Sequence, residues 1–254
     1  MRFGAFASAL LVLALCCCSG PDPEHFWDGY DFSSTDGLDP IDEAGDRFVR
    51  YATLLNRVDT TRAGACIRDF LDSAAADTVS YYVYSDMFVE AFHHRKSPCY
   101  NNDLFRIYLS KAVEDGIATE YERWDERALL HKTYQNLPGS IAADGLLLPV
   151  DGDPATVLEM AAASPRTIIY LIGQAGCRSC ADKMKELEKK TARSTQLIGV
   201  VAGNRRGEAF WLQDNLGERW TVALAGESFL RDWDFSFAPV IYVLDRSGKI
   251  KSIK

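Results

Sequence analysis

Two cysteines, Cys177 and Cys180, are the residues of this chain whose types and spacing could do chemistry. They follow an apolar, β-branched run (167–172) and a few small residues, and a charged stretch with helical patterning runs from Ala181 to Ala192. This order predicts a strand, a tight turn and a helix that has Cys177 at its N-terminus. Unpaired backbone N–H groups and the helix dipole stabilise a thiolate there. Two thiols one helical turn apart can close a small disulfide and reopen it, so the pair has the form of a redox switch.

Other uses of such a cysteine pair fit the sequence less well. A zinc site needs further ligands at suitable spacing, but the chain has no second Cys-x-x-Cys, and His93 and His94 are too close-set. Covalent haem attachment needs a histidine after the second cysteine, where Ala181 stands. We therefore expect no metal site and no cofactor. A structural disulfide between Cys177 and Cys180, or two ordinary cysteines at a helix start, is the alternative to a redox pair.

The composition bounds the size and the partners of the protein. Its 254 residues are 47% hydrophobic, which suffices for one large domain or two modest ones. The formal net charge of −8 and the pI near 5.1 argue against nucleic acid as a partner. After residue 20, no stretch is long and apolar enough to span a bilayer.

The N-terminus has the features of a secretory signal. Arg2 precedes an apolar run (5–15), and three consecutive cysteines (16–18) follow it. The cysteine end resembles that of a bacterial lipoprotein signal, in which the first mature residue is a lipid-modified cysteine. Cys18 fits that position best and Cys17 second. An ordinary cleaved signal or a membrane anchor is the alternative.

The remaining cysteines are consistent with an oxidising compartment. Apart from Cys177 and Cys180, the mature chain keeps Cys66 and Cys99, so its cysteine count is even. Cys66 and Cys99 either form a structural disulfide that ties two helices together or are free buried thiols. We expect a lipid-anchored protein that faces the periplasm in the cell envelope of a Gram-negative bacterium. Ser19, rather than an aspartate, after the lipidated cysteine favours the outer membrane if enteric sorting rules apply.

The chain divides into four parts by texture. We predict a signal peptide (1–17), a tether and lead-in segment (18–39), a small all-helical domain (40–138) and an α/β domain (139–254) with a mixed sheet. An aromatic cluster in the lead-in segment (26–32) either packs on the next domain or forms an exposed binding patch. In the helical domain, Asn101 to Asp103 offer N-caps, and Gly116 ends the helix that they begin.

The periodicity also gives the expected elements. Predicted helices cover 41–58, 66–71, 79–93, 104–113, 117–135, 155–160, 181–192, 206–215 and 227–233. Predicted strands cover an edge strand and turn at 142–152, then 167–172, 196–202, 220–224, 240–244 and 249–253.

The α/β domain resembles a thioredoxin-fold domain of the membrane-tethered TlpA/ResA kind. The resemblance rests on Cys177-Arg178-Ser179-Cys180 at a strand-to-helix junction, and on Phe-Ala-Pro-Val-Ile-Tyr-Val-Leu-Asp-Arg-Ser-Gly-Lys-Ile at 237–250. It implies that Pro239 is cis and lies across from the cysteine pair. Backbone groups of its neighbour Ala238 would then bind the substrate chain.

The upstream part also resembles a known domain. Phe26-Trp27-Asp28, Ser97-Pro98 and the stretch 136–142 are similar to a helical domain of unknown function that precedes thioredoxin-like domains in Bacteroidetes lipoproteins.

The α/β domain departs from the usual pattern at three places. Gly176 replaces the tryptophan before the first cysteine, which leaves a less bulky surface for substrate. Leu171 replaces the buried carboxylate that many thioredoxins use to relay the proton of the second cysteine. The chain ends at Lys254, where the family usually adds a helix. One face of the sheet then depends on the helical domain or a partner for cover, or the sequence is cut short.

Together these features predict a membrane-tethered thiol–disulfide oxidoreductase of the cell envelope, a reductase or isomerase rather than an oxidase. The Cys177 thiolate would attack a disulfide-bearing envelope protein, and Cys180 would resolve the mixed disulfide. Arg178 either favours the thiolate electrostatically or is a solvated surface charge. The resemblance implies a membrane electron donor. The alternative is a non-enzymatic thioredoxin-fold lipoprotein that binds an envelope partner and in which the pair is a structural disulfide.

Overall fold

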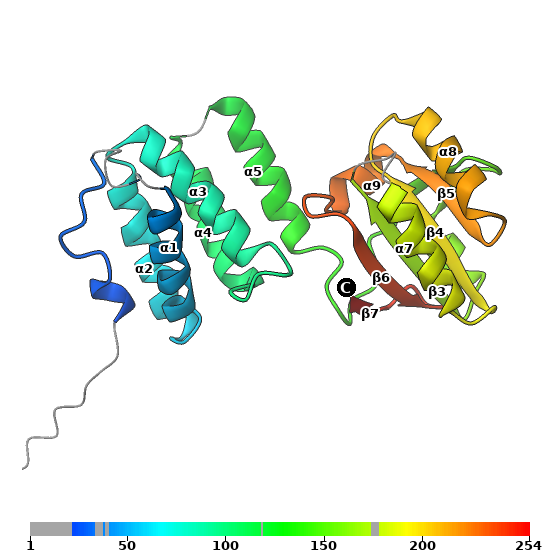
Figure 1. Cartoon of the computed structure of the whole chain (residues 1–254), viewed down its shortest axis with the longest axis horizontal. Helices are drawn as coiled ribbons and strands as arrows, with labels where there is room; N and C mark the ends of the chain where they lie inside the picture. Colours follow the sequence, from blue (N-terminus) through cyan, green and yellow to red (C-terminus); the bar gives the residue numbers. More distant parts are fainter. Residues whose placement is uncertain (1–21, 34–37, 39–40, 118, 174–177) are drawn as a thin grey trace, which may run out of the picture.

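The structure is a computed structural model that describes residues 22–33, 38, 41–117, 119–173 and 178–254, without the side chains of 41, 42 and 120–123. A helical unit (residues 22–138) lies beside a sheet unit (residues 139–254), and the last helix of the first unit stands next to the second (Figure 1). The predicted signal peptide, with Cys18, lies outside the described residues.

Five α-helices form the described part of the helical unit: α1 (Ile41–Leu55), α2 (Thr60–Ala74), α3 (Thr78–Phe92), α4 (Asn102–Asp115) and α5 (Glu120–Thr133). Side-chain caps explain where three of them begin, because Asp59, Asp77 and Asn101 each accept a hydrogen bond from a backbone N–H of the first turn. Gly116 follows α4 with a left-handed φ of 65°, a conformation that favours glycine. The predicted caps of α4 are therefore present at both ends.

The aromatic cluster of the lead-in segment packs on the helices, which is the first of its two predicted alternatives. The Trp27 ring lies 5.1 Å from Phe70 and 5.6 Å from Tyr51, centroid to centroid. The first described residues of the lead-in segment are also held against the helices. Asp22 accepts hydrogen bonds from the Arg62 guanidinium, which holds the 3₁₀ turn η1 (Pro23–His25) against α2.

Cys66 and Cys99 are both buried and do not form a disulfide, so the structure has the free-thiol alternative. The Tyr51 hydroxyl donates to the carbonyl oxygen of Cys66 at 2.9 Å, whereas Cys99 Sγ lies 3.6 Å from Thr53 Oγ1 and near the Val49 carbonyl. Residues 49 and 53 share one face of α1, and residue 51 is about 200° around the helix from residue 49. The helix therefore separates the two thiols. Burial raises the pKa of Cys66.

The sheet unit contains seven described strands in the order β2-β1-β5-β4-β3-β6-β7. They are β1 (Leu146–Pro149), β2 (Ala155–Thr156), β3 (Arg166–Ile172), β4 (Thr195–Val201), β5 (Trp220–Ala225), β6 (Val240–Asp245) and β7 (Ile250–Ile253). The central strands β3, β4 and β5 are parallel, and the other pairings are antiparallel, so the sheet is mixed as predicted.

Four described helices cover the two faces of this sheet: α6 (Val157–Ala162), α7 (Arg178–Lys189), α8 (Arg206–Leu216) and α9 (Glu227–Asp232). Successive residues of β3 point to opposite faces, as the pleat requires. Ile169 and Leu171 join the core under α6 and α9, and Ile168 and Tyr170 join the core under α7 and α8.

Several predicted elements differ in extent from the observed ones, among them the three that follow. Residues Ala155 and Thr156 form β2 instead of the first turn of a helix, and Thr156 then caps α6 by a reciprocal capping box with Glu159. Helix α2 begins at Thr60, earlier than expected, because Asp59 caps it. The helix after the cysteine pair ends at Lys189 rather than Ala192.

Candidate active site

The candidate site lies where β3 ends and α7 begins. Cys180 is in the first turn of α7 and is 8% exposed, on the face that also carries the buried Ala181 and Met184. This face packs on β4 at Gly199, where a Cβ atom would lie 2.7 Å from Met184 Cε. Gly176, Cys177 and the disulfide predicted between Cys177 and Cys180 lie outside the described residues.

The solvent face of α7 carries charge. Arg178 is exposed, and so are Lys183 and Lys185. Arg178 immediately follows Cys177 in the sequence, so its guanidinium is available to act on a thiolate there. Its predicted electrostatic role stays a prediction.

The peptide bond between Ala238 and Pro239 is cis. The strand register explains why this bond lies at the site. β6 pairs antiparallel with β3, and Leu171 is opposite Val240. Continuing this register by two residues brings Gly173 opposite Ala238, and a Cβ atom at Gly173 would lie 3.1 Å from Ala238 Cβ. Gly173, the last described residue before the cysteine pair, therefore lies beside the cis-proline segment, defined here as residues 234–239.

Leu171 is the residue for which the sequence predicted the absence of a buried carboxylate near the cysteine pair. Leu171 is fully buried in the core under α6 and α9. A leucine cannot accept or donate a proton, so this position cannot relay the proton of Cys180.

A partly buried carboxylate does occur in the cis-proline segment, at Asp234, whose side chain is 21% exposed. Asp234 Oδ2 lies 2.7 Å from His93 Nε2 of the helical unit, and its other oxygen accepts hydrogen bonds from the Ser236 N–H and hydroxyl. Burial works to raise the pKa of Asp234, but the His93 imidazole and the Ser236 donors outweigh it and hold the pKa at about 2. Asp234 is therefore ionised at neutral pH.

Aromatic contacts from the helical unit flank the same segment. The His94 ring stacks on Phe237 at 4.6 Å with an angle of 12° between the planes, and the His93 ring meets Phe237 edge-on at 5.4 Å. His93 in turn stacks on Phe105 of α4 at 4.3 Å. The end of α3 thus contacts the residues that lead into Pro239.

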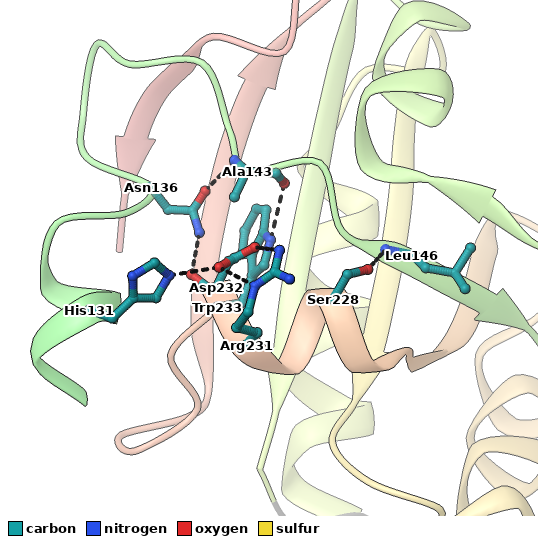
Figure 2. Close-up of polar contacts among 8 residues, drawn as sticks. All are labelled: His131, Asn136, Ala143, Leu146, Ser228, Arg231, Asp232 and Trp233. Carbon is teal, nitrogen blue, oxygen red and sulfur yellow. Dashed lines mark hydrogen bonds and ion pairs between the residues drawn. The ribbon is translucent and has the colours of Figure 1, made fainter. Parts of the chain in front are cut away.

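A second polar junction between the units forms around Asp232 (Figure 2). His131 Nε2 of α5 is 2.8 Å from Asp232 Oδ1, and Asn136 Nδ2 donates to the Asp232 carbonyl oxygen at 2.9 Å. Arg231 lies against the same carboxylate, and its hydrogen bond is the largest cause that lowers the pKa of Asp232. The Asn136 side-chain oxygen accepts a hydrogen bond from the Ala143 N–H, so this one amide joins the end of α9 to the segment that leads into β1.

Sequence reasoning missed these interface residues. It considered His93 and His94 only as metal ligands and did not consider Asp234 at all. One local signal was present, since Asp234-Phe-Ser236 is an Asx-turn pattern shortly before the critical proline. Nothing local connects that turn to the histidines, because the contact joins segments that are far apart in the chain.

Comparison with known proteins gives a match to structures. No protein-family profile matches the chain, and no curated protein matches its sequence. A crystal structure of a thioredoxin-like protein from Bacteroides caccae aligns over 99% of this chain and 94% of its own, with a TM-score of 0.62 at 14% identity. This chain has a thioredoxin-like fold. Because the alignment spans nearly the whole chain, it covers the helical unit as well as the sheet unit.

Other solved structures align with less than half of the chain. A thiol:disulfide interchange protein from a Bacteroides species matches 46% of this chain and 81% of its own at 17% identity, with a TM-score of 0.37. The thioredoxin domain of a thiol-disulfide oxidoreductase from Bacteroides vulgatus matches 47% of this chain and 89% of its own at 18% identity, also with a TM-score of 0.37.

The described residues include neither a cluster of metal-binding side chains nor a membrane-spanning helix. No three His, Cys, Asp or Glu side chains in that part of the chain are grouped so that they could hold a metal ion. Nor does any helix in the same part have the length and apolar character needed to cross a membrane.

Proposed function

We propose that this protein is a thiol–disulfide oxidoreductase of the bacterial cell envelope that acts on disulfide-bearing proteins as a reductase or isomerase. The observation that carries the proposal is the position of the cis-proline segment beside the end of β3, where Gly173, the last described residue before the cysteine pair, lies against Ala238. In this arrangement a polypeptide bound along the cis-proline segment presents its disulfide to the Cys177 thiolate.

The proposed cycle conserves atoms and electrons. Cys177 Sγ, as a thiolate, attacks one sulfur of a substrate disulfide, so that the substrate S–S bond breaks, a mixed disulfide forms and the second substrate sulfur leaves as a thiolate. Cys180 Sγ then loses its proton and attacks the Cys177 sulfur. The substrate leaves as a dithiol and the protein is oxidised. A dithiol reductant in the membrane returns two electrons to the pair.

The surroundings of the two cysteines support different roles for them, with Cys177 as the attacking thiol and Cys180 as the resolving thiol. Cys180 is 8% exposed within α7, which suits a resolving thiol that reacts only after the first sulfur is engaged. Cys177 directly precedes α7 in the sequence, and an anion at that position gains from the helix dipole. Because Leu171 is fully buried and apolar, the Cys180 proton has to leave by another route, such as water.

We propose that the mature protein is lipid-anchored through Cys18 and faces the periplasm, with the outer membrane favoured by Ser19. The support is the sequence of the first 20 residues. Metabolic labelling with a fatty acid, followed by fractionation of the envelope, tests this. Cys18→Ser should lose the label, and Cys17→Ser should keep it. Label that persists in the Cys18→Ser variant would contradict lipidation at that residue.

The experiment that tests the enzymatic proposal is a measurement of the reduction potential and the thiol reactivity of the pair. The protein should begin at residue 19 and carry Cys66→Ala and Cys99→Ala, so that only the pair titrates. We expect a potential between about −120 and −270 mV, the range of thiol-exchange proteins, and rapid alkylation of Cys177 below its ordinary pKa. Cys180→Ala should accumulate a mixed disulfide with a reduced-and-reoxidised protein substrate, and Cys177→Ala should not.

The second candidate is a non-enzymatic binding module, which the apolar Leu171 and the Gly176 substitution favour. In that case the reduction potential of the Cys177–Cys180 disulfide would lie below roughly −300 mV, and the thiol of Cys177 would not have a lowered pKa. The same titration therefore separates the two functions.

A further inference from the structure

We propose that His93 and His94, at the end of α3, are positioning residues for the cis-proline segment, so that the helical unit determines how a polypeptide substrate binds at the site. The inference rests on the proposed oxidoreductase function and adds a role for the helical unit in it. It concerns the binding of the substrate chain and not the chemistry of the sulfurs.

The first observation is the close contact between the His93 ring and the Asp234 carboxylate, which joins the two units. The His93 and Asp234 side chains are only 10% and 21% exposed, and their nearest atoms are 2.7 Å apart. The contact therefore ties the start of the cis-proline segment to the end of α3.

The second observation is the clamp on Phe237. The His94 ring lies parallel to the Phe237 ring at 4.6 Å, and the His93 ring approaches it from another direction at 5.4 Å. The stacking of His93 on Phe105 anchors one side of this clamp in the core of the helical unit. Aromatic pairs in such geometry prefer defined relative orientations, so the clamp restricts the ring of Phe237.

The third observation is the path from Phe237 to the substrate. Phe237 directly precedes Ala238, whose N–H donates to the Phe235 carbonyl at 3.1 Å and closes a tight turn. The Ala238 side chain packs beside Gly173. Pro239, in contrast, is exposed to solvent. The tip of the segment is thus open to a partner, while its flank is held by the two histidines.

These contacts predict a specific kinetic effect. If the histidines orient the backbone on which a polypeptide lies, their loss should weaken substrate binding and leave the cysteine pair unchanged. A small disulfide that needs no extended binding surface should not detect the change. A merely structural role would lower stability without this separation of KM from kcat.

The test uses the full mature chain and the variants His94→Ala and His93→Gln, with His25→Ala as a matched control. His25 pairs with Asp28 on η1 and is 73% exposed, remote from the segment. For reduction of insulin, as a protein disulfide, we expect both variants to raise KM about tenfold with kcat unchanged. We expect the reduction potential and the rate with 5,5′-dithiobis(2-nitrobenzoate), as a small disulfide, to equal those of the wild type and of His25→Ala.

Three results would overturn the proposal. Unchanged KM in both variants would show that the segment does not need the histidines. A shifted reduction potential, or a loss of rate with the small disulfide, would show that they act on the cysteines instead. If His93→Gln fails to fold, His94→Ala carries the test, because its ring is partly exposed.

Failure of the proposed function is distinguishable from failure of this inference. A wild-type protein that reduces neither disulfide contradicts the oxidoreductase function. Amide hydrogen exchange of residues 234–240 then decides the positioning role by itself. Faster exchange there in both variants, but not in His25→Ala, supports positioning, and unchanged exchange overturns it.

Discussion

The helical unit and the sheet unit fill their cores with different side chains. In the helical unit, rings from the lead-in segment and from helices α1 to α4 interlock. Phe70, for example, lies within 5.0–5.5 Å, centroid to centroid, of Trp27, Tyr84 and Phe88. In the sheet unit, the two cores consist mostly of isoleucine, leucine and valine. Large rings fill the irregular gaps between crossing helices, whereas short branched side chains stack on a pleated sheet.

The two units also differ in how closely neighbouring backbone segments pack at their glycines. In the sheet unit, β1 and α9 come so close that only a glycine fits at position 145, where a Cβ atom would lie 2.6 Å from Phe229 Cα. In α1 of the helical unit, a Cβ atom at Gly45 would meet nothing within 4 Å. Between the two units the contacts are polar or stacked, as at His93 and Asp234. Each region should therefore respond to a different kind of substitution.

The largest expected effect comes from removing a ring of the helical core. Phe70→Ala should destabilise the protein by about 3–5 kcal/mol, because Phe70 is 3% exposed and its loss leaves a cavity among rings. Urea unfolding followed by circular dichroism measures this. The exposed Phe210→Ala, on α8 of the sheet unit, is the control and should change stability by less than about 0.5 kcal/mol. Equal losses in the two variants would contradict the difference in packing.

A pair of glycine substitutions should act with opposite signs in the two units. Gly145→Ala should cost about 1–3 kcal/mol, since the new methyl group meets the Phe229 backbone, which cannot move aside easily. Gly45→Ala should stabilise by about 0.5–1 kcal/mol, because alanine is the better helix former and the site is open. Thermal and urea unfolding of both variants check this. A stabilising Gly145→Ala would show that the strand and α9 can separate at no cost.

The contact between the units should make stability depend on pH in acid. The pKa of Asp234 falls from an ordinary value of 3.8 to about 2 in the folded chain. A depressed carboxyl pKa stabilises the fold above its unfolded value, so this contribution, about 2 kcal/mol, is present above about pH 4 and is lost as the pH falls toward 2. Asp234→Asn should therefore be less stable than the wild type at pH 5 and equal to it near pH 2.

Urea unfolding at several pH values between 5 and 2 measures that difference. Asp28→Asn is the control, because its carboxylate is 71% exposed and lies in the lead-in segment, just after η1. Its stability should follow the wild-type curve throughout. A constant gap between Asp234→Asn and the wild type down to pH 2 would mean that the lost stability does not come from the ionised carboxylate.

Much of the fold could be predicted because local signals agreed with one another. Hydrophobic periodicity located the five helices of the helical unit and the central strands, and Asn101 and Gly116 marked the ends of α4 correctly. The cis bond before Pro239 followed from the resemblance of the motif around it and is confirmed. Residues 155–156 were assigned to a helix, because a two-residue strand has too few residues to show a period, and only its pairing with β1 defines it.

The motifs of the candidate site could be predicted from the sequence, but the contacts between distant segments could not. Cys180 and Ala238 could be selected from their motifs, and the register of β3 and β6 explains why Gly173, the last described residue before the cysteine pair, lies beside Ala238. Whether Cys66 and Cys99 were bonded could not be decided from the sequence, because an even number of cysteines and apolar surroundings fit either state. The position of α1 between them excludes the bond in the structure.

By itself, the sequence determined the order of helices and strands, the cysteine pair between a strand and a helix, and the cis proline that follows it in the chain. Only the tertiary structure decided that His93 and His94 hold the residues before that proline, and that Asp234 is a partly buried, ionised partner. The physical reason is that periodicity reports which face of an element is buried, but not which element covers it. That choice depends on packing between segments far apart in the chain, where the free energy of a contact is shared by residues that carry no common local signal.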